Sequence, residues 1–356
     1  MSVLDLARPE IRALTPYSSA RLEASGGEIF LNANESPWAP AADAGEGLNR
    51  YPDPQPAALR ERLAQLYGVA GEQLLIGRGS DEAIDLLVRA FCRAQADAIL
   101  ISPPTFGMYS VAAAIQGAAV QVCPLRADFS VDVDRLLAGL TPAVKLVFVC
   151  TPNNPTGGLL PLAEIARMAT ALRGRALLVV DEAYIEFAAA PSAQTLLAQH
   201  ENLAVLRTLS KAYALAGARV GVLLAAPCVI ELLRRILAPY PLPLGSIDAA
   251  LAATSDAGLE QAGGRIAMLR KQRDLLRHEL GLLPQVREVL PSAANFLCVR
   301  WDDAGATYAQ LRSAGIVVRD ATRYPGLAGC LRISVGTPAE NRRLLDVLGA
   351  CGKDAE

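Results

Sequence analysis

Short, uninterrupted apolar segments recur along the chain and alternate with stretches of helical periodicity. The apolar segments cover residues 73–76, 98–101, 120–123, 144–150, 176–180, 203–206 and 220–225. Continuous apolar runs are typical of strands that are buried on both faces of a sheet, and helical connections between them favour parallel neighbours. The pattern therefore predicts an α/β fold in which a mostly parallel, seven-stranded sheet forms a large domain.

The character of the sequence changes after the proline cluster at residues 239–243, which would interrupt a helix. A charged helix is expected at 265–280, and further strands at 286–290, 295–301, 316–319 and 331–335. This mixture predicts a smaller α+β domain. The expected organisation is an N-terminal arm at 1–45 that contacts a second subunit and forms part of the small domain, a large domain at 46–238 and a small domain at 239–356.

Composition narrows the classes of function. A hydrophobic content of 52% fits a well-packed protein, and a net charge of −2 gives no reason to expect nucleic acid or an anionic membrane as a partner. Seven cysteines without a Cys-x-x-Cys pair, and an N-terminus unlike a signal peptide, predict a reducing, cytoplasmic location and no metal site. The two histidines, His200 and His278, are expected on surfaces or helix flanks, which argues against histidine-based hydrolysis and zinc ligation.

One lysine lies in a sequence context that favours a reactive amine. Lys211 follows the apolar run 203–206 and lies between the hydroxyl of Ser210 and the cation of Arg219. Partial desolvation and a nearby positive charge both favour the neutral, nucleophilic amine, which can bind an aldehyde covalently. Asp181 and Tyr184 follow another apolar run and add a carboxylate and a phenol. Pyridoxal phosphate needs such a lysine, an acid for its ring nitrogen, and donors for its ring oxygen and phosphate.

Two further motifs follow strands, and each has an ordinary alternative. Gly77-Arg-Gly-Ser-Asp-Glu82 forms either an anion cradle at a helix start or a tight turn with Ser80 or Asp81 as the helix cap. Thr151-Pro-Asn-Asn-Pro-Thr-Gly157 has two interpretations. It is either a rigid loop that holds an asparagine amide as a donor to a cofactor oxygen, or a plain proline-rich turn. Asp181 alone could likewise be a cap or turn residue. Because the carboxyl ends of parallel strands converge at one edge, all these segments could reach a single pyridoxal phosphate site.

Almost end to end, the chain resembles the fold-type I pyridoxal-phosphate aminotransferases and, within them, the histidinol-phosphate aminotransferase family. The lysine segment and Asp181-Glu-Ala-Tyr184 are typical of the superfamily, and other segments narrow the resemblance. The segments that carry it are Leu31-Asn-Ala-Asn-Glu-Ser-Pro-Trp38, Arg50-Tyr-Pro-Asp-Pro-Gln-Pro56, Gly77 to Glu82, Pro103-Pro-Thr-Phe-Gly-Met-Tyr109, Thr151 to Gly157, Asp181 to Phe187, Arg207 to Gly221 and Cys330-Leu-Arg-Ile-Ser-Val-Gly336. Ser36 stands where an asparagine is common in the family.

The resemblance implies a role for each matching residue. Lys211 would hold the cofactor and later transfer the proton, while Asp181 would pair with the ring nitrogen. Tyr184 and Asn154 would bind the ring oxygen, and Phe106 would stack on the ring where tyrosine is more usual. The cofactor phosphate would be surrounded by Ser80, Asp81, Thr208, Ser210 and Arg219, with Tyr51 reaching it from the other subunit of a homodimer.

For the substrate, two arginines near the ends of expected small-domain strands could clamp a phosphate with their fork-like guanidinium groups. These are Arg319 and Arg332, and Arg319 could instead form a surface ion pair with Asp320. The resemblance implies that both arginines bind the substrate phosphate, and the carboxylate of glutamate in the other half-reaction. It adds Tyr17 and Asn34 to the substrate site.

The resemblance implies ping-pong transamination between glutamate and imidazole acetol phosphate, which yields histidinol phosphate and 2-oxoglutarate in histidine biosynthesis. Two other reactions on the same scaffold stay open at this point, namely decarboxylation of threonine phosphate and transamination of aromatic amino acids. A cofactor-binding regulator would need a DNA-binding segment, and the chain has no basic cluster to provide one.

Overall fold

The computed structural model describes residues 2–17, 19–20, 29–45 and 47–349. Within them a seven-stranded sheet has the order β1-β7-β6-β5-β4-β2-β3. β7 is antiparallel to both of its neighbours and the other pairs are parallel, so the expected mostly parallel sheet is confirmed. The strands are β1 (Leu74–Gly77), β2 (Ala98–Ile101), β3 (Ala119–Val122), β4 (Val144–Cys150), β5 (Leu177–Asp181), β6 (Leu203–Thr208) and β7 (Gly221–Ala225).

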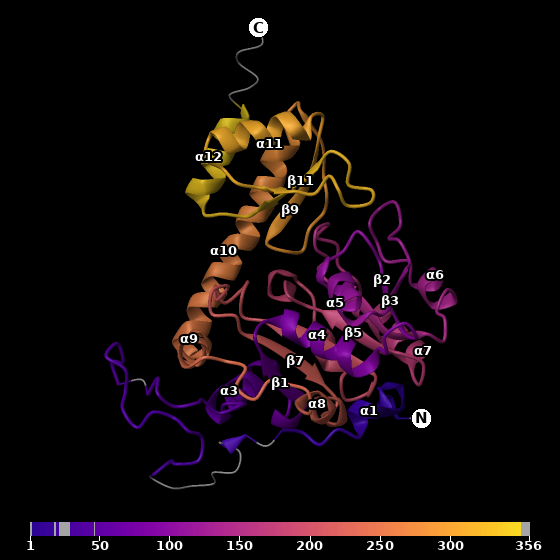
Figure 1. The fold of residues 1–356 in the computed structure, drawn as a ribbon. Helices are drawn as coiled ribbons and strands as arrows, with labels where there is room; N and C mark the ends of the chain where they lie inside the picture. Colours follow the sequence, from indigo (N-terminus) through magenta and orange to yellow (C-terminus); the bar gives the residue numbers. More distant parts are fainter. Residues whose placement is uncertain (1, 18, 21–28, 46, 350–356) are drawn as a thin grey trace.

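Helices cover both faces of this sheet (Figure 1). Successive side chains of a strand point to opposite faces, so Leu74 and Ile76 join one apolar core whereas Leu75 joins the other. The first core also takes side chains from α3 (Ala57–Tyr67), α6 (Val133–Ala138) and α7 (Leu162–Leu172). The second takes them from α4 (Ser80–Phe91), α5 (Met108–Gln116) and α8 (Pro227–Arg234). Burial on both faces explains why the strands read as continuous apolar runs. Short 3₁₀ segments complete this unit at η2 (Gly71–Gln73), η3 (Ile185–Phe187) and η4 (Ala193–Leu196).

The second unit has a four-stranded antiparallel sheet of order β10-β11-β9-β8. Its strands are β8 (Val286–Val289), β9 (Phe296–Trp301), β10 (Arg319–Asp320) and β11 (Cys330–Ser334), and its helices are α10 (Asp256–Gly281), α11 (Ala304–Ser313) and α12 (Pro338–Gly349). Helix α10 rises from the large sheet to the small one, as Figure 1 shows. It begins earlier than the expected residue 265, because Ser255 accepts a hydrogen bond from the Gly258 N–H and caps the helix.

The proline cluster separates two helices, as expected from the sequence. α8 ends at Arg234, and α9 (Leu244–Thr254) begins directly after Pro243. Ile247 and Ala250 of α9 are buried in the same core as α3, so this helix packs under the large sheet before α10 leaves it. The domain boundaries expected at residues 45 and 238 stay predictions.

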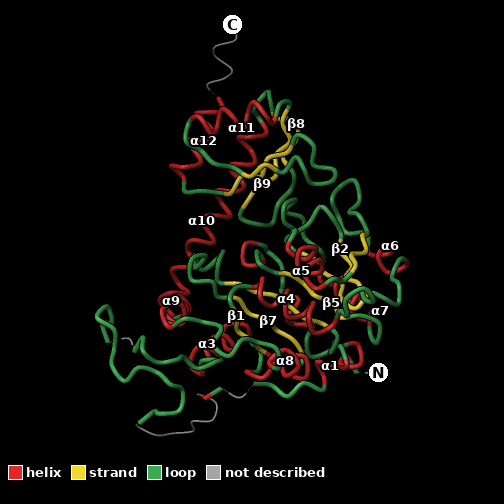
Figure 2. The backbone as a smooth tube through the Cα atoms, in the orientation of Figure 1, coloured by secondary structure: helices red, strands yellow, loops and turns green. Residues whose placement is uncertain are grey.

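The N-terminal segment first docks on the large unit and then leaves it. η1 (Val3–Leu6) and α1 (Pro9–Arg12) lie beside α4 and α8, with Val3 and Leu6 buried. Residues 29–45 form a loop that extends away from the body of the molecule (Figure 2). This loop exposes Ile29, Leu31 and Trp38 at 81%, 87% and 79% of their surface. Within the described ranges, no helix is long and apolar enough to cross a membrane.

Candidate active site

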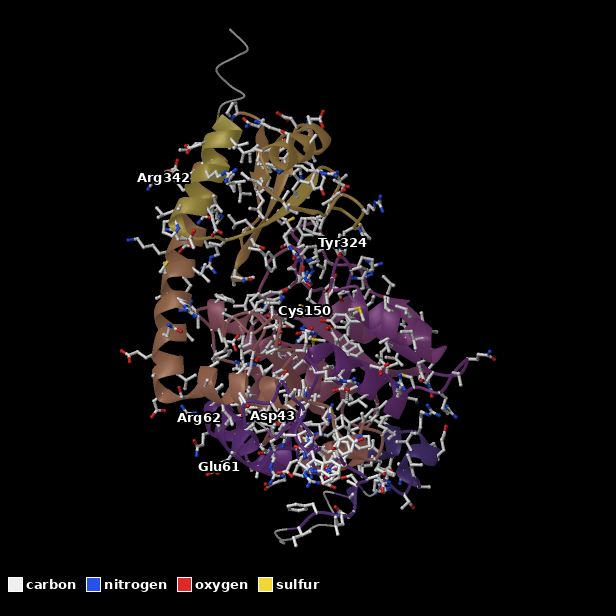
Figure 3. All side chains as sticks on the ribbon, turned by 60° about the vertical axis from the view of Figure 1, so that its left-hand side comes forward. Asp43, Glu61, Arg62, Cys150, Tyr324 and Arg342 are labelled. Carbon is white, nitrogen blue, oxygen red and sulfur yellow. The ribbon has the colours of Figure 1, made fainter. Side chains whose placement is uncertain are left out.

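A cavity opens at one edge of the large sheet, where β1, β4, β5 and β6 end and β7 begins. It faces the small sheet, and Cys150 at the end of β4 marks its position in Figure 3. The lining residues come from five separate segments, which the parallel topology brings together as the sequence predicts. They are Gly79, Ser80, Asp81, Phe106, Cys150, Asn154, Asp181, Ala183, Tyr184, Thr208, Ser210, Lys211, Ala216 and Arg219.

Asp181 lies at the floor of the cavity and is 2% exposed. The Tyr109 hydroxyl donates to its Oδ2 at 2.7 Å, and the Ala183 N–H donates to its Oδ1 at 3.1 Å. Burial raises the pKa of Asp181 to about 6, while these two hydrogen bonds and the more distant Lys211 act in the opposite direction. The carboxylate is therefore a buried acceptor that lacks a cation in hydrogen-bond contact within the described structure.

Lys211 lies on the cavity wall, directly after β6. Its Nζ is 5.9 Å from the centre of the Tyr184 ring. Burial lowers the pKa of Lys211, and the positive charges of Arg332 and Arg219 lower it further. These are the two effects that the sequence predicted, and both increase the fraction of neutral amine.

The start of α4 forms an anion cradle. Its N-cap is Gly79, which has a φ of 81° and provides no side-chain cap, so the capping alternative for Ser80 and Asp81 is not observed. The first N–H groups of the helix therefore face the cavity without a capping acceptor, an arrangement that favours an anion. Arg219 Nη2 lies 3.1 Å from Asp81 Oδ2, and its Nη1 lies 3.5 Å from Ser210 Oγ.

The loop after β4 contains two asparagines with different roles. Asn154 faces the cavity, and Asn153 stabilises the loop through hydrogen bonds. Asn153 accepts from Thr105 Oγ1 at 2.8 Å and donates to Thr156 Oγ1 at 2.8 Å. Asn154 lines the cavity, and its Oδ1 accepts a hydrogen bond from Arg332 Nη1. With its oxygen as the acceptor, Asn154 has its amide nitrogen as the donor that the functional interpretation of this motif needs, and the contact with a cofactor oxygen stays a prediction.

Arg332 projects from the small domain toward this cavity. Its guanidinium lies 5.2 Å from the centre of the Phe296 ring, and its Nε is buried without a hydrogen-bond partner in the described part of the chain. Arg319 on β10 lies directly opposite Arg332 on β11, so both side chains leave the same face of the small sheet. Two cations on one face, with an unused donor, form a suitable receptor for an anion.

Five of the expected residues are not among those that line this cavity within a single chain. Arg319 and Arg332 lie on the small sheet, and the other three lie elsewhere in the chain. Tyr17 borders a separate cavity beside Arg60 and Arg234. Tyr51 stacks on Tyr240 with ring centres 4.4 Å apart. Asn34 lies in the exposed loop of the arm, with a φ of 55°. The roles of Tyr17, Asn34 and Tyr51 stay predictions.

Tyr109 is a functional residue that its sequence context does not reveal, although it ends the segment Pro103 to Tyr109. Phe106 of the same segment lines the cavity, as expected. A fully buried tyrosine in an apolar helix gives no sign of its hydroxyl partner, and Asp181 is 72 residues away in the chain.

Comparisons with known proteins agree with this geometry. The family model "Aminotransferase class I and II" matches residues 28–348. The chain is 54% identical to a histidinol-phosphate aminotransferase of Stenotrophomonas maltophilia, over 98% of this chain and 97% of the relative. It is 51% identical to that of Xanthomonas axonopodis pv. citri, with the same coverage of both chains. A crystal structure of histidinol-phosphate aminotransferase from Sinorhizobium meliloti in complex with pyridoxal-5'-phosphate superposes with a TM-score of 0.75 at 29% identity, covering 90% of each chain.

Proposed function

The chain belongs to the class I and II aminotransferases and, within them, to the histidinol-phosphate aminotransferases; from this premise we propose how its residues carry out the reaction. It is a pyridoxal-phosphate enzyme that interconverts imidazole acetol phosphate and histidinol phosphate. Glutamate and 2-oxoglutarate form the proposed second substrate pair. The observation that carries the proposal is a sequence identity above 50% to histidinol-phosphate aminotransferases along nearly the whole chain. It is joined by a cavity that holds the lysine, the buried acid and the anion cradle.

The residues of the cavity fit pyridoxal phosphate. A protonated pyridine nitrogen would supply the cation that buried Asp181 lacks, and the uncapped start of α4 with Arg219 would receive the phosphate. Asn154 and Tyr184 would donate to the ring oxygen, and Phe106 would cover the ring. When bound, the cofactor supplies an aldehyde that captures amino groups and a ring that withdraws electrons from the α-carbon.

Lys211 is proposed as the general acid and base. Its lowered pKa makes the neutral amine more accessible near neutral pH, so that Nζ can take the proton from the substrate α-carbon and deliver it to C4′ of the cofactor. Arg219 and Arg332 favour this neutral form by charge repulsion. The same two arginines bind anions, so anion binding and the protonation of Lys211 are coupled in this site.

Arg332 and Arg319 are proposed to recognise the substrate phosphate, and the carboxylate of glutamate in the other half-reaction. Both anions suit planar guanidinium groups that donate through two parallel N–H bonds. The contact between Arg332 and Asn154 links this anion site to the proposed donor for the cofactor's ring oxygen. A substrate anion is therefore held at a fixed position relative to the reacting carbon, which lowers the entropic cost of reaction.

A homodimer is proposed to complete the site. The exposed apolar side chains Ile29, Leu31 and Trp38 lie on an extended loop, and such side chains are commonly covered by a second subunit. Tyr51 lies at the base of this loop and outside the cavity of its own chain. We propose that it reaches the phosphate site of the partner subunit. The cytoplasmic location also stays a prediction.

A panel of substrates tests the proposed function. Purified protein with pyridoxal phosphate and 2-oxoglutarate is assayed for glutamate formation with histidinol phosphate, histidinol, threonine phosphate and phenylalanine. We expect histidinol phosphate to give the highest kcat/KM, and histidinol to fall by about two orders of magnitude because Arg332 and Arg319 are left unpaired. Turnover of phenylalanine alone, or release of CO₂ from threonine phosphate without transamination, would identify one of the two rival reactions instead.

A further inference from the structure

We propose that Tyr109 is a positioning residue that holds the Asp181 carboxylate as an ionised acceptor for the protonated pyridine nitrogen. The inference rests on the proposed function and adds a residue to it. Tyr109 lies on α5 and is not among the residues that line the cavity. It would act on the cofactor only through Asp181.

The position of the Tyr109 hydroxyl is fixed by packing. The side chain has no exposed surface, and its ring stacks on Phe148 of β4 with centres 4.7 Å apart and planes 14° apart. Phe106 meets the same ring edge to face at 5.6 Å. A ring packed on two sides keeps its hydroxyl beside Asp181 Oδ2, to which it donates at 2.7 Å. Tyr109 thus supports both Asp181 and the aromatic wall that Phe106 forms.

The charges around Asp181 explain why this donor is needed. Burial acts against the ionised carboxylate, and the negative charge of Asp81 acts in the same direction. Tyr109, the Ala183 N–H and Lys211 favour ionisation, and Tyr109 is the strongest of the three. Cys150 adjoins Asp181 on the neighbouring strand, and burial raises the pKa of its thiol, which leaves it uncharged. Without the Tyr109 hydroxyl, a larger share of Asp181 would be protonated and would compete poorly for a pyridinium N–H.

The test is Y109F, which removes one oxygen and keeps the stacked ring. The affinity of the apoprotein for pyridoxal phosphate is measured by absorbance titration from pH 6 to pH 8, in the native, Y109F, D181N and double-variant backgrounds. We expect Y109F to weaken binding by about 10-fold or more, the size of a hydrogen bond to a charged group, with the larger loss at pH 6. In the D181N background the same change should alter affinity less than about twofold, because the carboxylate is no longer present.

Y67F is the matched control. Tyr67 is equally buried, but its hydroxyl has no hydrogen-bond partner in the described structure, so this variant should bind the cofactor as the native protein does. Unchanged affinity of Y109F at every pH would overturn the inference and leave the proposed function standing. An equal loss with and without Asp181 would also overturn it, because the effect would then be a general packing defect. Native protein that binds no pyridoxal phosphate would overturn both.

Discussion

At the scale of single residues, the two groups that define the site are held in charge states that cost free energy. Asp181 is buried as an acid whose ordinary pKa is 3.8, and Lys211 is partly desolvated beside two arginines. Both costs would be reduced when a cationic ring nitrogen and an anionic phosphate enter the cavity. We therefore expect the bound cofactor to raise the free energy of unfolding above that of the apoprotein.

We therefore predict that the D181N substitution raises the free energy of unfolding of the apoprotein at neutral pH. The pKa of Asp181 in the folded protein, about 6, lies above its ordinary value, so the native state binds more protons than the unfolded state between about pH 4 and pH 6. Asp181 therefore lowers the free energy of unfolding as pH rises through this window. We expect D181N apoprotein to be more stable than native apoprotein by about 1–3 kcal/mol at pH 7, and the gain to vanish near pH 4. Urea unfolding at both pH values measures it, and a gain that is equal at both pH values would contradict the assignment.

The site residues that could be predicted are those whose neighbours in the sequence indicate their position in the fold. Lys211, Asp181 and Asn154 each follow an apolar strand, so their type and position together indicated a shared edge. Tyr109 could not be predicted, because its partner depends on the packing of α5 against β5 rather than on neighbouring residues. Arg332 was predicted as a phosphate ligand, but its contact with Asn154 depends on how the two domains meet.

At the scale of elements, the cradle depends on the close approach of β7 and α4. A Cβ on Gly221 would lie 2.1 Å from the carbonyl carbon of Gly79 and 2.2 Å from the Ser80 nitrogen. A Cβ on Gly79 would lie 2.6 Å from Arg219 Nη2, in a backbone conformation with positive φ. Glycines at these two positions let Arg219 and the start of α4 face the same anion.

G221A is therefore expected to lower the free energy of unfolding by about 1–3 kcal/mol or more, because backbone atoms must move to admit the methyl group. G264A provides the comparison, since Gly264 lies within α10 and a methyl group added there would meet open space instead of a clash. The second change should raise stability by about 0.5–1 kcal/mol through helix propensity. Thermal unfolding of both variants checks the pair, and equal behaviour would contradict the close approach.

The boundaries of helices and strands could be predicted where the local sequence marks them. The proline cluster separated α8 from α9, and the apolar runs located all seven strands of the large sheet. The beginning of α10 was missed, because Gly263 and Gly264 are poor helix formers and the helix continues through them from its Ser255 cap. α9 was missed because its apolar side chains have weak helical periodicity and take their burial from the α3 core.

At the scale of the whole molecule, a single chain does not bring the described part of its N-terminal arm to the cavity. Tyr17, Asn34 and Tyr51 all lie on this arm or at its base, away from the cavity of their own chain. The sequence indicated these residues by family resemblance, and the geometry of one chain does not bring them to the cavity. The proposed homodimer, in which the second subunit supplies Tyr51, would account for both observations.

Mixed subunits test this arrangement. A Y51A chain keeps Lys211, and a K211A chain keeps Tyr51, so a hybrid dimer would contain one site with both residues. After unfolding and refolding the two inactive variants together, we expect about a quarter of native activity, because about half of the dimers are hybrid and each hybrid has one intact site. Mixing Y51A with a second K211A,Y51A variant is the control and should stay inactive. No recovery in the first mixture would show that Tyr51 acts within its own chain or not at all.

We propose above all that the cavity at the strand ends binds pyridoxal phosphate through Lys211. Borohydride reduction of the loaded protein, followed by peptide mapping of Lys145, Lys211, Lys271 and Lys353, tests it directly. We expect a stable cofactor adduct on Lys211 alone, and a large fall in labelling when histidinol phosphate is added before the reductant. A label on another lysine, or none on Lys211 in protein that turns over substrate, would contradict it.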